Sequence, residues 1–163
     1  MARFNSLGDR IKAYEKTYKH YLNPRSITII RIDGKSFSKW TSQQLFEKPF
    51  DYIITDAFNN LTEYLVNKIQ GCKLGYTQSD EITLILTDYD TLDTDSWFSG
   101  NIQKIVSVVA STATAFFNNY ISKYNFNDIQ LAMFYARVFQ VPTVDEAINT
   151  LVFRQNDAVH QKQ

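Results

Sequence analysis

The sequence has few cysteines, prolines and glycines, and no long apolar run. Cys72 is its only cysteine, which excludes an internal disulfide and a zinc site built from several cysteines. A reducing compartment is the simplest expectation for such a chain. No apolar segment approaches the ~18 residues of a membrane-spanning helix, and the first residues lack a signal-peptide core. We therefore expect a cytoplasmic protein with no membrane partner.

Net charge is also lacking, because 17 basic and 17 acidic residues cancel. Proteins that coat nucleic acid depend on many Lys and Arg contacts to phosphate, so this class is disfavoured. A polymerase-like enzyme with a local basic rim around an acidic metal centre stays compatible with neutrality. The 163 residues are 44% apolar, which is an ordinary globular composition. With no repeat and no linker, residues 1–163 are predicted to form a single domain.

Hydrophobic periodicity predicts a mixed chain of strands and helices. The expected helices are one that starts near Leu7 and ends before Asn23, then 49–69, 97–124 and 143–157, and the expected strands are 26–32, 72–77, 82–87 and 132–141. This order is βαββαβ inside flanking helices. It predicts an α+β, ferredoxin-like (split βαβ) fold, in which an antiparallel sheet carries helices on one face.

Acidic residues stand where two of the predicted strands end or turn. Asp33 closes the first strand, and Asp80 and Glu81 lie in the hairpin between the second and third strands. In a split βαβ sheet the first and third strands are neighbours, so these carboxylates can converge on one edge. Mg²⁺ prefers carboxylate and phosphate oxygens. On these residues alone, a turn at Asp33 and a solvated hairpin tip at Asp80 is the simpler interpretation.

The segment after Asp33 offers a second, weak signal. Residues 34–39 read Gly-Lys-Ser-Phe-Ser-Lys, so successive backbone N–H groups follow a flexible glycine, as in loops that cradle a triphosphate. The spacing is not that of a P-loop. Phe37, Trp40 and Phe46 are expected to lie in the core rather than to stack on bases.

Several segments together resemble the tRNA-His guanylyltransferase family, above all its shorter, bacterial-type members, which extend RNA in the 3′–5′ direction. Residues 31–40 (RIDGKSFSKW) and 75–81 (GYTQSDE) resemble two of the family's motifs, and residues 7–15, 134–142 and 153–158 resemble further segments in the expected order. The resemblance covers nearly the whole chain. It implies a polymerase-palm domain that adds nucleotides to the 5′ end of tRNA, with GTP preferred and ATP as the second substrate.

The same resemblance implies roles for particular residues. Asp33 and Asp80 hold two Mg²⁺ ions with the Gly34 carbonyl as a further ligand, and Glu81 joins both carboxylates in the catalytic set. Ser79 and Glu81 tune the metal ligand. The nucleotide contacts implied are Gly34, Lys35, Ser36, Phe37, Ser38, Lys48, Ser79, Lys104, Arg154 and Asp157. Without the family, Lys48 and Lys104 would be ordinary surface lysines, and Arg154 with Asp157 a simple helix ion pair.

Three departures from the family's pattern stand out. Tyr135 occupies a position that is usually acidic. Ser99, Gly100 and Asn101 stand where many members are basic, which weakens the site for activation with ATP. The chain ends at Gln163 where members continue, so a C-terminally truncated or minimal member is expected. The family implies a homo-oligomer, a dimer or a tetramer. A non-catalytic nucleotide- or RNA-binding palm and a nucleotidyl-cyclase-like palm enzyme are the alternatives.

Overall fold

A computed structural model describes residues 6–44, 51–124 and 130–160. Its elements follow one another in an order that contains the predicted βαββαβ core. The helices are α1 (Leu7–Thr17), α2 (Phe37–Gln43), α3 (Tyr52–Lys68), α4 (Ile102–Ile121) and α5 (Val144–His160), with short 3₁₀ turns at Trp97–Gly100 and Ser122–Tyr124, and the strands are β1 (Ile27–Gly34), β2 (Cys72–Gln78), β3 (Glu81–Leu86) and β4 (Phe134–Val141).

The strands form an antiparallel sheet in the order β2-β3-β1-β4. The ferredoxin-like split βαβ topology predicted from the sequence is therefore confirmed. Register places Asp33 of β1 opposite Glu81 of β3 on one side and Tyr135 of β4 on the other. Because directly opposite residues point to the same face, these three side chains share one face of the sheet.

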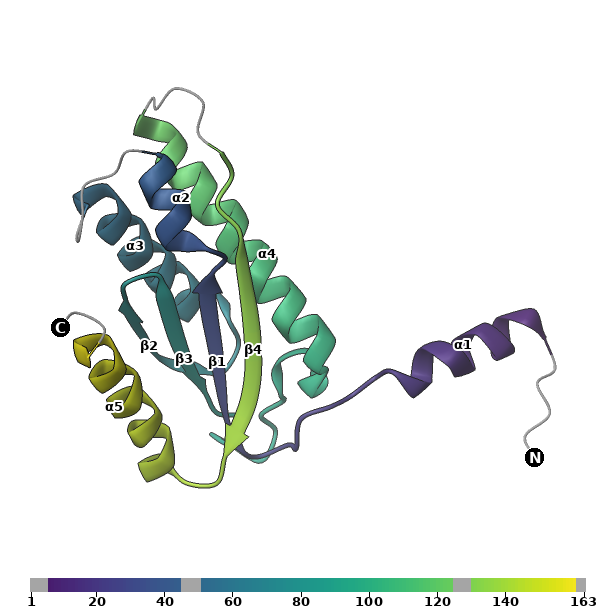
Figure 1. Cartoon of the computed structure of the whole chain (residues 1–163). Coiled ribbons are helices and arrows are strands. Elements are labelled where there is room, and N and C mark those ends of the chain that lie inside the picture. The colour runs from purple at the N-terminus through teal and green to yellow at the C-terminus, as the bar shows by residue number, and fades with distance from the viewer. Residues whose placement is uncertain (1–5, 45–50, 125–129, 161–163) are drawn as a thin grey trace.

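The main core lies between the sheet and the helices α3 and α4, which cover one face (Figure 1). β1 contributes Ile30 and Ile32 to this core, and both are fully buried. The facing helices bury side chains at helical spacing: Ala57, Leu61 and Leu65 from α3, and Ile105, Val109, Ala113 and Phe117 from α4. Each large apolar side chain buried in this way stabilises the fold by about 1.5–3 kcal/mol.

The opposite face of the sheet is covered in part by α5 (Figure 1). The prediction of helices on one face thus holds for α3 and α4, while α5 lies on the other. Ile27 and Ile29, the alternate residues of β1, are buried there with Ala147 of α5. Further along β1 the same face carries Arg31 and Asp33. One face of the sheet is therefore apolar near the start of β1 and charged near its end.

The start of one predicted helix differs clearly in the structure, while the first helix ends before Asn23 as expected. The helix expected from Trp97 begins at Ile102, because Phe98, Ser99 and Gly100 have positive φ and Asn101 caps α4 through a bond from the Lys104 amide to its side-chain oxygen (3.0 Å). The first helix ends at Thr17. None of the residues of α1 is buried, and Figure 1 shows that it stands apart from the sheet.

The final helix matches its predicted capping. The amide of Glu146 donates to the Thr143 hydroxyl at 3.1 Å. Of the helices in the described ranges, none has the length and apolar character needed to cross a bilayer.

Candidate functional site

The end of β1 and the β2–β3 hairpin meet at one end of the sheet. The amide of Gly34 donates to the Asp80 carbonyl at 3.0 Å, and Asp33 lies opposite Glu81. Gln78 pairs with Glu81, so Ser79 and Asp80 form the turn between the two strands. Ser79 has a positive φ of 53°. The predicted convergence of the first strand's end with the start of the third is confirmed.

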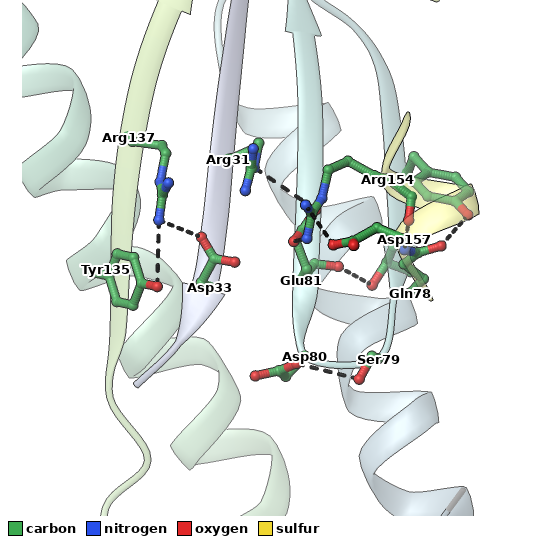
Figure 2. Close-up of polar contacts among 12 residues, drawn as sticks. Arg31, Asp33, Gln78, Ser79, Asp80, Glu81, Tyr135, Arg137, Arg154 and Asp157 are labelled. Atoms are coloured by element: carbon green, nitrogen blue, oxygen red, sulfur yellow. Dashed lines mark hydrogen bonds and ion pairs between the residues drawn. The ribbon is translucent and has the colours of Figure 1, made fainter. Parts of the chain in front are cut away.

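Charged side chains gather on the α5 face around this junction (Figure 2). Arg31 and Asp33 come from β1, Glu81 from β3 and Arg137 from β4. Their shared face follows from strand alternation, because Arg31 lies opposite Arg137 and Asp33 opposite Glu81. The site is therefore a patch of mixed charge on the α5 face of the sheet.

Glu81 is the most deeply buried of these charges, with a side chain 8% exposed. Arg154 of α5 binds it with two bonds: Nε donates to Oε1 at 2.6 Å, and Nη2 donates to Oε2. Arg31 Nε lies farther from Oε1, at 3.9 Å. A planar guanidinium matches a carboxylate in this two-bond geometry. In the structure, Glu81 is therefore the anchor of an ion pair between the hairpin and α5.

Asp33 has no comparable partner. Its Oδ2 atom is buried and lacks a hydrogen bond among the described residues, and the nearest cation, Arg137 Nη2, lies 3.6 Å away. Burial, followed by the negative charge of Glu81, raises the pKa of Asp33 above its usual range, and Arg31 and Arg137 oppose this shift only in part. A buried carboxylate with an unused oxygen fits an additional cation.

Asp80 has a similar character at the hairpin turn. Burial raises the pKa of its carboxyl group, although its Oδ1 accepts a bond from the Ser79 hydroxyl at 3.3 Å. Figure 2 shows Asp80 beside Ser79 in the hairpin turn, at the end of the sheet where Asp33 lies. One carboxylate thus comes from the end of β1 and the other from the β2–β3 turn, at one corner of the fold.

These residues fit magnesium by their chemistry. Among residues 6–44, 51–124 and 130–160 there is no cluster of three or more acidic, histidine or cysteine side chains arranged as a metal cage. Mg²⁺ does not need one, because it is commonly held by one or two carboxylates together with water and substrate phosphates. Asp33 and Asp80 provide two carboxylates, and Gly34 follows Asp33 directly and donates its amide to the Asp80 carbonyl.

The loop predicted to wrap a triphosphate is shorter than expected. The amide of Gly34 is bonded to Asp80, and the amide of Lys35 donates to the Met133 carbonyl at 2.8 Å. Phe37 and Ser38 already belong to α2, whose preceding residue Ser36 has a left-handed conformation. The N–H groups left for an anion are those at the start of α2, since the first amides of a helix lack partners within it.

Gly34 and Phe37 have a packing role that the sequence did not reveal. A Cβ at Gly34 would lie 2.6 Å from the Phe37 ring, so a glycine is required for this close approach. Phe37 is buried in a cluster of aromatic rings with Trp40, Phe58, Phe117 and Phe134. The expectation that Phe37 and Trp40 belong to the core is confirmed, and Phe46 lies outside the described residues.

The lysines predicted to contact nucleotide do not lie together in the structure. Lys35 is exposed beside Ser36 at a hollow that Lys39, Gln43 and Met133 also line. Lys104 is exposed on the first turn of α4, and this turn lies at the far end of the sheet from the end of β1 (Figure 1). The structure does not bring Lys104 to the Asp33–Asp80 corner. Lys48 lies outside the described residues.

Arg154 and Asp157 do form the ion pair expected from their spacing, at 3.1 Å, but Arg154 also reaches the hairpin. Sequence reasoning did not single out Arg137 and Gln78, which join the site. Gln78 Nε2 donates to the Arg154 carbonyl at 2.5 Å. Strand alternation was the available signal for Arg137, since it lies two residues from Tyr135 on the same face.

Comparison with known proteins places the chain in a family. The sequence model of tRNAHis guanylyltransferase matches residues 8–142. An uncharacterized protein of Acanthamoeba polyphaga mimivirus is 35% identical over 123 residues, which are 70% of this chain and 40% of that protein. The tRNA(His) guanylyltransferase of Neurospora crassa is 26% identical over 157 residues, 94% of this chain and 51% of the relative. The chain thus spans about half, or less, of these curated relatives.

Solved structures agree with this relationship. A bacterial tRNA(His) guanylyltransferase-like protein, solved with ATP and with GTP, is 45% identical to the chain, with TM-scores of 0.89 and 0.88. The match covers 94% of this chain and 66% and 71% of the two solved chains. The Saccharomyces cerevisiae enzyme shares the fold, with a TM-score of 0.72 at 23% identity. Because the family's sequence model matches most of its length, the chain belongs to the tRNAHis guanylyltransferase family.

Proposed function

We propose that this chain is a Mg²⁺-dependent nucleotidyltransferase that adds nucleotides, GTP preferred, to the 5′ end of tRNA, in tRNA repair or in tRNA-His maturation. The observation that carries the proposal is the meeting of Asp33 and Asp80 at one corner of the sheet, joined by the bond from Gly34 to the Asp80 carbonyl. Both carboxyl groups are partly buried, and within the described part of the chain neither accepts a hydrogen bond from a cationic side chain. Family membership and the ATP and GTP complexes of the bacterial relative support nucleoside triphosphates as substrates.

In this reaction the 3′-hydroxyl oxygen of the incoming nucleotide attacks a 5′ phosphate activated with ATP. A phosphodiester bond forms and the activating adenylate leaves. Asp33, Asp80 and the Gly34 carbonyl would hold Mg²⁺, which supplies charge stabilisation for the attacking and leaving oxygens. The chain's own contribution is placement: β1 and the hairpin fix the two carboxylates before any substrate arrives.

Phosphate contacts are proposed on two sides of this corner. Lys35, Ser36 and the first amides of α2 lie next to Gly34, and the hydroxyl of Ser79 lies beside Asp80. Helix N-termini and lysine ammonium groups both favour phosphate oxygens. Lys48 remains a predicted contact. Lys104 lies on a turn at the far end of the sheet, so a phosphate that it contacts would bind at a second place, away from the Asp33–Asp80 corner.

We also propose a cytoplasmic homo-oligomer, a dimer or a tetramer. Leu7, Ile11 and Tyr14 of α1 are exposed on a helix of 11 residues that buries nothing in its own chain. Isolated helices of this length are marginal in water, so α1 needs a covering surface. Sedimentation of the purified chain measures its mass, and a monomer at all concentrations would remove this part of the proposal.

The activity is tested by incubating the chain with a 5′-truncated tRNA transcript, labelled GTP, ATP and Mg²⁺. We expect the transcript to gain labelled nucleotides at its 5′ end, and we expect no extension by Asp80→Asn or when Mg²⁺ is chelated. A chain that binds GTP but never extends the transcript would favour the non-catalytic palm instead.

A further inference from the structure

The hairpin that carries Asp80 is held on both strands by a single residue of α5 (Figure 2). On β3, the side chain of Arg154 binds Glu81, the residue that follows Asp80. On β2, the carbonyl of Arg154 accepts a bond from Gln78 at 2.5 Å. Gln78 and Glu81 are the pair that closes the turn Ser79–Asp80. Arg154 therefore forms hydrogen bonds to the hairpin on either side of its two turn residues.

These contacts between Arg154 and the hairpin are largely removed from water. The side chain of Arg154 is 16% exposed and that of Glu81 is 8% exposed. Gln78 is held in turn, because its Oε1 accepts a bond from the Tyr76 hydroxyl at 2.5 Å. Two parallel bonds from a guanidinium fix direction as well as distance, which a single ammonium contact does not.

Most of the guanidinium donors of Arg154 are used within the chain. Its Nε and Nη2 atoms are bonded to Glu81, and its Nη1 donates to Asp157 at 3.1 Å. Each nitrogen of the guanidinium thus already has a carboxylate partner. Two N–H groups are left, one on Nη1 and one on Nη2, and they belong to a side chain that is only 16% exposed and already oriented by two carboxylates.

We propose that Arg154 is a positioning residue that fixes Asp80 relative to Asp33 through the hairpin, and that it does not contact the nucleotide. The inference rests on the proposed function, in which Asp80 is a functional carboxylate. The link to Asp33 is the bond from the Gly34 amide to the Asp80 carbonyl, at 3.0 Å. When the contacts between Arg154 and the hairpin are lost, this bond should open more often.

The test measures hydrogen exchange of the Gly34 amide by NMR, with neither metal nor nucleotide present, together with kcat and KM for GTP. The variants are Arg154→Gln, which removes the guanidinium group, and Arg154→Lys, which keeps the charge without the two-bond geometry. Gln155→Ala, at an exposed position on the same helix, is the matched control. We expect Gly34 protection to fall at least about tenfold in Arg154→Gln, the scale of a lost charge-assisted bond. Arg154→Lys should recover only part of it, and kcat should fall in both variants with KM for GTP near the parent value.

Two results would overturn the inference. Unchanged Gly34 protection in both variants would show that Arg154 does not hold the hairpin. A raised KM for GTP at normal kcat and normal protection would make Arg154 a nucleotide contact. If Arg154→Gln does not fold, Arg154→Lys decides in the same way. If the parent chain never extends RNA, the proposed function fails, but Gly34 exchange still shows whether α5 orders the hairpin.

Discussion

Asp33 and Asp80 are partly buried carboxylates, and among residues 6–44, 51–124 and 130–160 no cationic side chain donates a hydrogen bond to either. Burial raises the pKa of both groups. Such a placement opposes folding at neutral pH, because the ionised form is better solvated in the unfolded chain. Functional sites commonly show this conflict between stability and chemistry. Its consequence can be measured through the pH dependence of unfolding.

Asp33→Asn and Asp80→Asn should each be at least as stable as the parent at pH 7. A carboxyl group whose folded pKa is raised favours the folded state at low pH, and this contribution is lost as pH rises through the folded pKa. At pH 7 the parent therefore carries a penalty that the amide variants lack. Thermal unfolding should give Tm values equal to or above the parent at pH 7, and the difference should shrink below the usual Asp pKa of 3.8.

The control for this prediction is Asp145→Asn, on the exposed first turn of α5. It should show no comparable gain at pH 7. A marked drop in Tm for Asp33→Asn at pH 7 would mean that the contact with Arg137 stabilises the fold more than burial of the carboxylate opposes it.

Gly34→Ala should destabilise the fold by about 1–3 kcal/mol, because the added methyl group would meet the Phe37 ring at 2.6 Å in a packed aromatic cluster. Gly8→Ala is the matched control. A methyl group there meets only the Ser6 hydroxyl, at 3.7 Å. Urea unfolding measures both free energies, and equal effects at the two glycines would refute the packing role of Gly34.

Lys48→Ala should fold normally and raise the GTP concentration needed for turnover. A charge-assisted bond from an ammonium to a phosphate contributes roughly 1.5–3 kcal/mol, or about 10- to 150-fold in affinity. Lys12→Ala, on the exposed surface of α1, serves as control. If the kinetics of Lys48→Ala match those of the parent at all GTP concentrations, Lys48 is an ordinary solvated lysine and does not contact the nucleotide.

Among the elements, those with a strong local pattern were predictable from the sequence. β1 is rich in isoleucine, and the hairpin and α3 follow from alternation and helical periodicity. Helix α2 was missed, because its start at Phe37 depends on the left-handed Ser36 and on a tertiary aromatic cluster. The late start of α4 was missed for a similar reason, since Phe98 and Ser99 adopt positive φ that nothing in their residue types requires.

The candidate site was predictable where topology fixes it. The strand order alone predicts that Asp33 lies next to the hairpin, because β1 and β3 are adjacent in the sheet. The contact between Arg154 and Glu81 does not, because it joins residues far apart in sequence through the packing of α5 on the sheet. Local spacing suggested only the bond from Arg154 to Asp157, which also forms. Long-range ion pairs of this kind leave no periodic signal.

Helix α1 contributes no buried residue, so its removal should cost the remaining fold little. We expect deletion of residues 1–17 to leave the free energy of unfolding within about 0.5 kcal/mol of the parent, measured in urea at a concentration where the chain is monomeric. The Tyr21–Asn101 bridge stays in place in this variant. A larger loss would show that α1 packs on its own chain.

In the whole molecule, the two faces of the sheet have different tasks. The face toward α3 and α4 carries the large apolar core, while the α5 face holds the charged groups near the end of β1. This division lets buried charges accumulate without interrupting the main core. It also explains how a chain with no net charge can present a local site of mixed charge.

The proposed function requires that Asp33 and Asp80 together hold a divalent cation. Titration with Mn²⁺ as a probe for Mg²⁺, in the presence of GTP and monitored by electron paramagnetic resonance, tests it most directly. We expect protein-bound Mn²⁺ in the parent and in Asp145→Asn, and loss of this binding in Asp33→Asn and in Asp80→Asn while both variants stay folded. Mn²⁺ binding equal to the parent in either variant would contradict it.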